Sequence, residues 1–457
     1  MLFQSQAFVL GFLPIAIACY YAAASSERAR QTVLIIVSLV FYGWWDARFI
    51  PLLVGQITAT WLVAYFHKRT GRTAWLYVGI VLNLFSLATF KYLNFLLGTA
   101  QTLLGVELPH ADVVLPIGIS FFSFQLISYL VDRLRDDAPV YPFRPFALFV
   151  LFFPHLIAGP IVRHNELVPQ LALDPRRPGL WFRIACGLAL FALGFAKKVL
   201  VADALATRCV DPLFNDALGH ALTFTEAWNA TLGFSVEIFL DFSAYTEMAI
   251  GIALMFGLLL PDNFRRPYLA TDLRDFWRRW HITLSNFIRD YLYIPLGGSR
   301  HGDARYVAAT LGSMAICGLW HGAGWTYVAW GVWHGIGLAV CRFWQRLARP
   351  MPTFLAWTIT MLFVLGGWVL FRAANFTTAV DILRSMAGLN GFGGRFDEGP
   401  VIAFGMLLAA LVPSAHEIKD NWIRPTRVGA IAVGLLAAFC ILEVGKGAPV
   451  NFIYFRF

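Results

Sequence analysis

Two histidines in otherwise apolar surroundings are the first candidates for chemistry. His321 stands in the segment Gly318–Trp325, where glycines on both sides allow another backbone or an extended ligand to approach closely. An imidazole titrates near neutral pH, so a histidine shielded from bulk water can serve as a general base. The same side chain could instead bond a carbonyl group of a neighbouring helix. His334, in the similar tripeptide Trp333-His334-Gly335, shows that the motif alone does not decide between these roles.

A second histidine lies 40 positions earlier, in a stretch rich in tryptophan and arginine. On one continuous helix, Trp277, Trp280 and His281 would face the same way. An amphipathic helix at a membrane surface also combines Trp and Arg, but that does not explain a histidine on the aromatic face. Polar side chains continue the stretch at Ser285, Asn286 and Tyr291.

A third polar stretch, Asp241–Met248, interrupts an apolar run. It contains two carboxylates, Asp241 and Glu247, and such groups at membrane depth line a cavity or pair with a buried partner. Asp241 and Tyr245 share one face of a helix, which is consistent with a tunnel wall and also with an ion pair that locks two helices.

These features occur together in one known family. A tryptophan-rich basic helix with a histidine, followed 40 residues later by Trp320-His321-Gly322, resembles the membrane-bound O-acyltransferase family. In that family the second position is the catalytic histidine, and the first is His, Asn or Asp. His281 at the first position is similar to the bacterial branch that acetylates or D-alanylates envelope polymers. Further segments resemble the membrane subunits that O-acetylate alginate, namely 116–122, 157–163, 241–243 and 371–373.

The resemblance implies an O-acyltransferase that takes acetyl groups from cytoplasmic acetyl-CoA and holds no permanently bound cofactor. His321 is then a general base or a transient acetyl carrier, and His281 orients it or holds the thioester carbonyl. Candidate contacts for the CoA phosphates are Arg278, Arg279 and Lys198, although the same cations could bind lipid headgroups. Candidates for the tunnel wall, or for side chains that support the histidines, are Trp280, Trp320, Asp241, Tyr245, Ser285, Asn286 and Tyr291.

The acceptor implied by the resemblance is a hydroxyl of an extracytoplasmic polysaccharide such as an alginate-like exopolysaccharide, reached directly or through a partner acyltransferase. One alternative is another envelope polymer: peptidoglycan, cellulose, or teichoic acid that receives D-alanine. A transporter of acyl or glycan intermediates is a different class, and it would function without His321. A catalytically silent scaffold would assemble with partners without any turnover.

The elements that position these residues are expected to be membrane helices. Of the 457 residues, 58% are hydrophobic and only 14% are charged, against about 25% charged in a soluble domain. The apolar stretches predict an all-α, polytopic integral membrane protein with about eleven transmembrane helices. Re-entrant or buried helices complete it around a central tunnel, for example at 145–162, where Pro154 and Pro160 interrupt the apolar run. We expect one membrane-embedded acyltransferase domain over residues 1–457.

Charge predicts the orientation in the membrane. Lys and Arg concentrate in alternate connections such as 67–72, which places those loops in the cytoplasm. Both termini are then extracytoplasmic, in a bacterial inner membrane. The net charge of +9 is explained by these loops, and no nucleic-acid-binding motif occurs. The six cysteines and the histidines show no spacing typical of a metal site.

Overall fold

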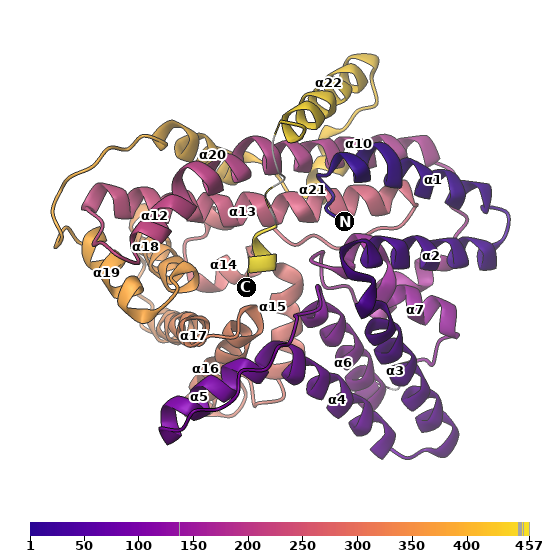
Figure 1. The fold of residues 1–457 in the computed structure, drawn as a ribbon, viewed down its shortest axis with the longest axis horizontal. Helices are drawn as coiled ribbons and strands as arrows, with labels where there is room; N and C mark the ends of the chain where they lie inside the picture. The colour runs from indigo at the N-terminus through magenta and orange to yellow at the C-terminus, as the bar shows by residue number, and fades with distance from the viewer. Residues whose placement is uncertain (137, 447–449, 451, 457) are drawn as a thin grey trace. The chain divides into compact units, whose positions relative to one another are not determined.

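The protein is helical throughout its described part. The computed structural model describes residues 1–136, 138–446, 450 and 452–456, and within them all regular structure is helical, with no strand (Figure 1). Among the described residues, six helical stretches are long and apolar enough to cross a membrane, and the bent pair Gly399–Leu411 and Ala415–Trp422 would make a seventh. The all-α polytopic fold is therefore confirmed, and the number of about eleven crossings stays a prediction.

Internal contacts divide the chain into two compact units. The first comprises Met1–Ala192, Thr246–Pro261 and Arg424–Leu435, and the second comprises Leu193–Tyr245, Asp262–Ile423 and Leu436–Phe457. Three of the boundaries fall inside helices, namely α10 (Leu180–Ala196), α13 (Phe224–Met255) and α22 (Arg427–Val444). A single domain over the whole chain stays a prediction.

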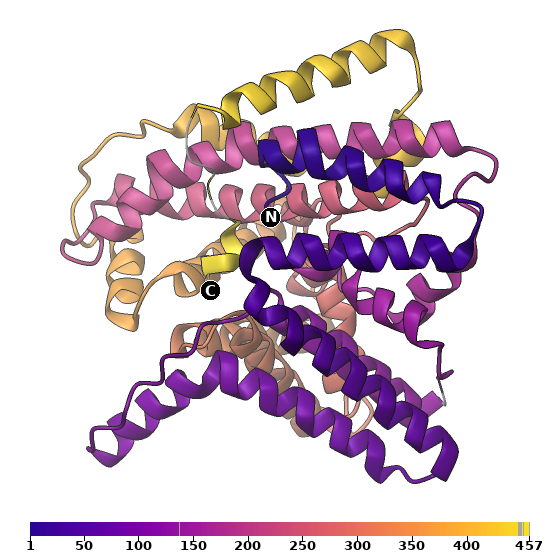
Figure 2. The same ribbon diagram turned by 45° about the vertical axis from the view of Figure 1, so that its right-hand side comes forward.

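The first unit is built from apolar helices, and the helices α2 and α3 show common capping residues at their ends. The side chain of Ser26 caps α2 by accepting a hydrogen bond from the Ala29 N–H, and α3 ends at Gly71 in the left-handed region. Helices α3, α4 and α6 pack on one another (Figure 2). The apolar segment interrupted by Pro154 is buried, as expected. The elements are η1 (Ala7–Phe12), α1 (Leu13–Ala22), α2 (Glu27–Asp46), η2 (Ala47–Phe49), α3 (Ile50–Thr70), α4 (Ala74–Leu87), η3 (Ala88–Tyr92), α5 (Leu93–Leu104), α6 (Ile119–Asp136), α7 (Phe143–Leu151), α8 (Phe153–Leu156), α9 (His164–Leu167) and η4 (Val168–Ala172).

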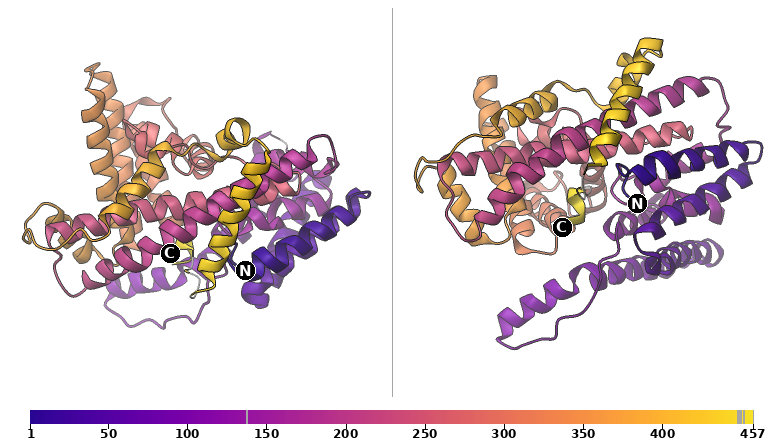
Figure 3. Two further views of the ribbon diagram at one scale, coloured as in Figure 1. Left: turned by 90° about the horizontal axis from the view of Figure 1, so that it is seen from above. Right: turned by 45° about the horizontal axis from the view of Figure 1, so that its top comes forward.

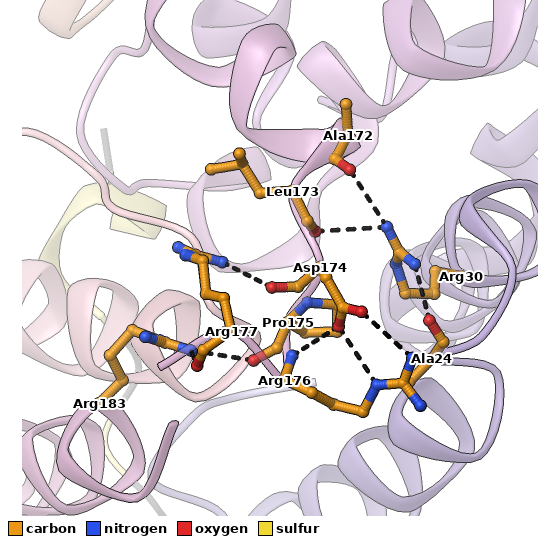
Figure 4. Close-up of polar contacts among 9 residues, drawn as sticks. All are labelled: Ala24, Arg30, Ala172, Leu173, Asp174, Pro175, Arg176, Arg177 and Arg183. Atoms are coloured by element: carbon orange, nitrogen blue, oxygen red, sulfur yellow. Dashed lines mark hydrogen bonds and ion pairs between the residues drawn. The ribbon is translucent and has the colours of Figure 1, made fainter. Parts of the chain in front are cut away.

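Arginines hold the loop between η4 and α10 by bonding its backbone (Figure 4). The buried guanidinium of Arg30 donates to the carbonyl oxygens of Ala24 (2.8 Å) and Leu173 (3.3 Å). Arg183 donates to the carbonyls of Pro175 and Arg177 in the same loop. Carbonyl oxygens that no helix satisfies thereby gain charged donors, so this loop is held by arginines of the helices α2 and α10.

Two long helical stretches approach closely at paired glycines. A Cβ atom on Gly187 of α10 would lie 2.5 Å from the carbonyl oxygen of Gly251 on α13, so the two backbones touch at this point. The two long helices run side by side (Figure 3). An apolar stretch of 18 residues within α13 is entirely buried. After α10 the first stretch continues through η5 (Lys197–Ala202), α11 (Asp203–Leu205), η6 (Ala206–Val210) and α12 (Asp211–Asp216), with π-helical turns in η5 and η6.

The second unit carries both candidate histidines on short helices and helix ends. Its helix α19 is amphipathic and buries Ala379 and Ile382. The elements are η7 (Pro267–Leu269), α14 (Leu273–Arg279), α15 (Ile282–Ile288), η8 (Arg289–Tyr293), α16 (Gly302–His321), α17 (Trp325–Arg346), α18 (Thr353–Arg372), α19 (Phe376–Met386), α20 (Gly399–Leu411), α21 (Ala415–Glu417), η9 (Ile418–Trp422) and η10 (Ile453–Arg456).

Helices α16 and α17 form a hairpin whose backbones meet at two glycines. A Cβ atom on Gly318 would lie 2.1 Å from the carbonyl oxygen of Tyr327, and one on Gly331 would lie 2.1 Å from that of Met314. No side chain fits at either distance, so the two helices approach closely only because these positions are glycine. The hairpin fixes the position of His321, the last residue of α16.

We expect Gly331→Ala to destabilise the protein by about 1–3 kcal/mol, because the new methyl group forces α16 and α17 apart. Gly312→Ala, on α16, is the matched control, since its Cβ atom would meet only the Leu296 side chain at 3.8 Å. Thermal unfolding of both variants in detergent measures the difference. Equal midpoints for the two variants would contradict the close approach at Gly331.

Candidate active site

His281 lies at a break between two short helices. Helix α14 ends at Arg279, α15 begins at Ile282, and His281 between them has a left-handed backbone with φ of 42°. The expectation that Trp277, Trp280 and His281 share one face of a continuous helix is therefore wrong. The reversal turns the imidazole into the interior, where it is fully buried. A left-handed backbone is strained for a residue with a side chain, and such strain often marks a functional position.

Asn263 holds His281 in place. Its side-chain oxygen lies 3.0 Å from His281 Nδ1 and accepts hydrogen bonds from the Thr283 N–H (3.2 Å) and hydroxyl (2.9 Å). A backbone N–H can only donate, so the shared atom must be the amide oxygen and His281 Nδ1 must carry the proton. The backbone carbonyl of Asn263 also accepts from the Ile282 N–H at 2.9 Å. His281 Nε2 is left as an acceptor, and it makes no hydrogen bond to the described residues.

The protonation state of His281 follows from its burial. Removal from water lowers the pKa of His281 to about 3, because the charged form loses its hydration. The ring is therefore neutral at physiological pH. It acts as a hydrogen-bonding group with a fixed tautomer rather than as a cation.

His321 and His281 are brought together in an aromatic pocket. Their ring centroids are 6.3 Å apart, and Trp320 lies 4.9 Å from the His321 ring and 6.0 Å from the His281 ring. Trp330 and Phe371 cover His321 at 5.1 and 5.3 Å. Both imidazoles are nearly inaccessible to water. Such surroundings strengthen electrostatic interactions and exclude water from the two imidazoles.

His334, the internal comparison for the motif, has different surroundings. The indole N–H of Trp277 donates to His334 Nδ1 at 3.3 Å, and the rings of Trp330 and Phe363 pack around it. The structure therefore places His321, and not His334, next to His281.

The C-terminal segment contributes residues that the sequence analysis did not single out. The ring of Tyr454, in η10, lies 5.6 Å from His321 and 6.4 Å from His281. Phe452 is buried and packs 4.7 Å from the ring of Tyr245. The only local signal is the aromatic run that follows the last apolar stretch. Asn263 was also missed, because an isolated asparagine carries no pattern.

The buried carboxylate Asp241 pairs with Lys198. Lys198 Nζ lies 2.9 Å from Asp241 Oδ1 and 2.6 Å from Asp203 Oδ1, and all three side chains are largely withdrawn from water. Asp241 and Tyr245 lie on the same side of α13, as expected, and both face the C-terminal segment. Lys198 is thus engaged by two carboxylates, which argues against a phosphate contact.

A cavity of about 600 Å³ opens beside the histidines' helices. Ser285, Thr310, Ser313 and Cys317 line it, and Cys317 lies one helical turn before His321. Its arginines are Arg274, Arg278, Arg289, Arg342 and Arg346. Asp303 pairs with Arg342 and Arg346, and Asp290 pairs with Arg289, so positive charge predominates.

The remaining predicted residues divide between the cavity and the core. Arg278 and Ser285 line the cavity, whereas Arg279 pairs with Asp275 at 2.9 Å and is not among the lining residues. Trp280 is fully buried and stacks on Phe276, which makes it a packing residue. Asn286 lies on α15 and Tyr291 on η8, with the ring of Tyr291 against Phe287. Neither lines the cavity.

The region that contains both histidines matches a known family. The model of the membrane-bound O-acyltransferase family matches residues 73–380. The chain belongs to this family. It is 40% identical over 428 residues to the peptidoglycan O-acetyltransferase of Helicobacter pylori, and this alignment covers 86% of this chain and 80% of that protein. It is 41% identical over 399 residues to the probable alginate O-acetylase AlgI of Pseudomonas aeruginosa, and this alignment covers 84% of this chain and 75% of that protein.

A more distant relative is the teichoic acid D-alanyltransferase of Streptococcus thermophilus, at 26% identity over 77% of this chain and 80% of that protein. Membership in the membrane-bound O-acyltransferase family confirms the resemblance seen in the motifs, and with it a membrane O-acyltransferase. The roles of His281 and His321 within it stay predictions.

We expect Asn263→Ala to abolish most acyl transfer, because His281 loses the acceptor that sets its tautomer. Several buried donors also lose their partner, at a cost of about 3 kcal/mol in unfolding free energy. Asn263→Asp keeps an acceptor oxygen and should retain the fold. Acyl turnover and thermal unfolding of both variants test this. Full turnover in Asn263→Ala would show that the hydrogen bond between Asn263 and His281 is not needed for acyl transfer.

Proposed function

We propose that this membrane-bound O-acyltransferase moves an acetyl group from cytoplasmic acetyl-CoA to a hydroxyl of an extracytoplasmic polysaccharide, through His321. One observation carries the proposal: His321 and a neutral His281 meet in a dry aromatic pocket, one helical turn from an arginine-rich cavity. Family membership supports the acyl-transfer chemistry.

The chemistry of the proposed reaction needs one proton acceptor. In the general-base route, a nitrogen of His321 takes the proton of the acceptor hydroxyl as its oxygen attacks the thioester carbonyl. The carbon–sulfur bond then breaks, and the leaving thiolate of CoA takes up the proton. In the alternative route a nitrogen of the imidazole attacks the thioester carbonyl, the carbon–sulfur bond breaks, and the leaving thiolate of CoA takes the N–H proton of the ring. The acceptor hydroxyl then attacks the acetylated imidazole, takes the acetyl group and returns its proton to the ring. His281 Nε2 is an acceptor in its neutral tautomer, so we assign His281 to orient His321 rather than to donate to the thioester carbonyl.

The cavity supports the choice of donor. CoA carries several phosphate charges, and arginines bind phosphate oxygens through paired donors. Arg278 is exposed at the cavity and makes no ion pair to the described residues, so it is retained as a phosphate contact. Arg342 joins it. Lys198 and Arg279 are left out, because both are engaged by carboxylates away from the cavity lining.

The acceptor is proposed from the relatives. Those at 40% and 41% identity are named for peptidoglycan and for alginate, and both polymers present sugar hydroxyls outside the cytoplasm. An alginate-like exopolysaccharide is our first choice, with peptidoglycan as the second, and a partner acyltransferase as the route to either polymer. The positive-inside distribution of Lys and Arg supports an inner-membrane protein with extracytoplasmic termini and a cytoplasmic mouth for the donor.

We expect His321→Gln to abolish CoA release from acetyl-CoA in nanodiscs, because no base or carrier remains at the centre. His334→Gln is the matched control, since it changes an equally buried histidine in a similar tripeptide and should keep most of the turnover. Both variants must first be shown to fold by thermal unfolding. Equal turnover in His321→Gln and wild type would remove His321 from the chemistry. If the wild type releases no CoA with alginate, with peptidoglycan or with a partner protein, the alternative function as a transporter would be favoured.

We expect Arg278→Gln and Arg342→Gln each to raise the KM for acetyl-CoA about fivefold with little change in kcat. An exposed ionic contact to phosphate contributes about 1 kcal/mol to binding of the substrate and the transition state alike. Arg395→Gln, which replaces an exposed arginine outside the cavity lining, serves as the control. Steady-state kinetics with purified protein measure the effect. An unchanged KM in both variants would show that acetyl-CoA binds outside this cavity.

A further inference from the structure

We propose that Asp241 is a positioning residue that seats the C-terminal segment, Phe452–Phe455, against the two histidines. The kinetic consequence rests on the proposed function, whereas the seat itself is a property of the fold. Neither family membership nor the catalytic motifs assigns this segment a role, since the matched region ends at residue 380.

The seat begins with one hydrogen bond between distant parts of the chain. The backbone N–H of Ile453 donates to Asp241 Oδ2 at 2.8 Å, across 212 positions of sequence. Asp241 is only 2% exposed, and Ile453 is equally buried. A bond between a carboxylate and a backbone N–H is charge-assisted and stronger than a neutral one, especially away from water.

The other oxygen of Asp241 is held by a lysine. Lys198 Nζ lies 2.9 Å from Asp241 Oδ1 and 2.6 Å from Asp203 Oδ1. Lys198 belongs to η5, a π-helical turn, and π-helical turns frequently occur at functional sites. The lysine holds Oδ1 and thereby fixes the orientation of the carboxylate, so that Oδ2 points at the Ile453 N–H of the C-terminal segment.

Apolar contacts complete the seat on the same face of α13. The ring of Phe452 lies 5.9 Å from Phe242 and 4.7 Å from Tyr245. The ring of Tyr454 lies 4.5 Å from Phe242, which itself packs 4.7 Å from His281. One turn of α13 therefore binds the segment by a charge and by two aromatic side chains. Phe242, one of these two side chains, also packs against His281, a candidate catalytic residue.

Seating the segment closes one side of the pocket. Trp320, Trp330 and Phe371 cover His321 from α16, α17 and α18, and Tyr454 covers it from η10. If the segment leaves, His321 gains access to water and loses a wall that restricts its rotamers. Asp241 thus acts on the reaction through the segment and not by touching the reacting atoms.

The seat can be tested by hydrogen exchange of the full-length protein in nanodiscs, followed by mass spectrometry. Amides of residues 452–455 should be protected in the wild type. Asp241→Ala should speed their exchange roughly tenfold or more, because the segment opens locally. Asp203→Ala is the matched control, since it removes the other carboxylate of Lys198 and leaves the bond between Asp241 and Ile453 in place, and it should keep the protection. Asp241→Asn keeps an acceptor oxygen and serves if Asp241→Ala fails to fold; exchange should then rise less.

Kinetics then test whether the seat matters to the reaction. Asp241→Ala should lower kcat roughly tenfold or more while the KM for acetyl-CoA changes little, because the donor cavity is separate from the segment. In a variant that lacks residues 452–457, Asp241→Ala should cause no further loss, since its effect passes through the missing segment.

Each result is decisive for one part of the proposal. Unchanged exchange in Asp241→Ala would overturn the seat. Faster exchange with unchanged kcat would overturn the positioning role, and additive losses in the shortened variant would make Asp241 a structural residue only. If wild type shows no turnover, the proposed function fails, yet the exchange measurement still decides the seat.

Discussion

The candidate active site depends on one constraint: a polar group that is removed from water must find a partner inside the protein. His281 is fully buried, and its ring is useful only in one orientation and one tautomer. The side-chain oxygen of Asn263 supplies both, since it also receives the N–H and the hydroxyl of Thr283 and cannot rotate away without breaking all three contacts. The left-handed backbone at His281 is the local cost of aiming the ring at this partner.

Close packing of backbones is the second condition for the site. His321 is the last residue of α16, so its position depends on how tightly α16 lies against α17. Glycines at positions 318 and 331 allow approaches that any side chain would prevent. Around the pair, aromatic rings of Trp320, Trp330 and Phe371 exclude water without offering competing acceptors. The pocket is thereby suited to an acyl intermediate that water would hydrolyse.

Arginine serves two different purposes in this molecule. Arg30 and Arg183 direct their guanidinium groups at backbone carbonyls and hold a loop. Arg278 and Arg342 line a cavity whose five arginines outnumber the two carboxylates, Asp303 and Asp290, that pair with them. The first use is satisfied within the protein, whereas the second leaves donors for an anionic ligand. Composition and local charge are the same in both cases, and only the acceptors that surround each guanidinium distinguish them.

Much of this protein is determined by the sequence itself. Hydropathy predicted a polytopic helical membrane protein, because a bilayer needs long apolar helices whatever they pack against. The paired histidine motifs indicated the family, and helical periodicity placed Asp241 and Tyr245 on one face. Tertiary structure alone decided the rest: the break that aims His281, its clamp at Asn263, the engagement of Lys198 by two carboxylates, and the arrival of Tyr454 beside His321. Periodicity reports only neighbours within a few residues. Apart from the Lys198–Asp203 pair, these contacts join residues from 18 positions apart (His281 and Asn263) to 133 positions apart (Tyr454 and His321), and packing of the whole chain brings them together.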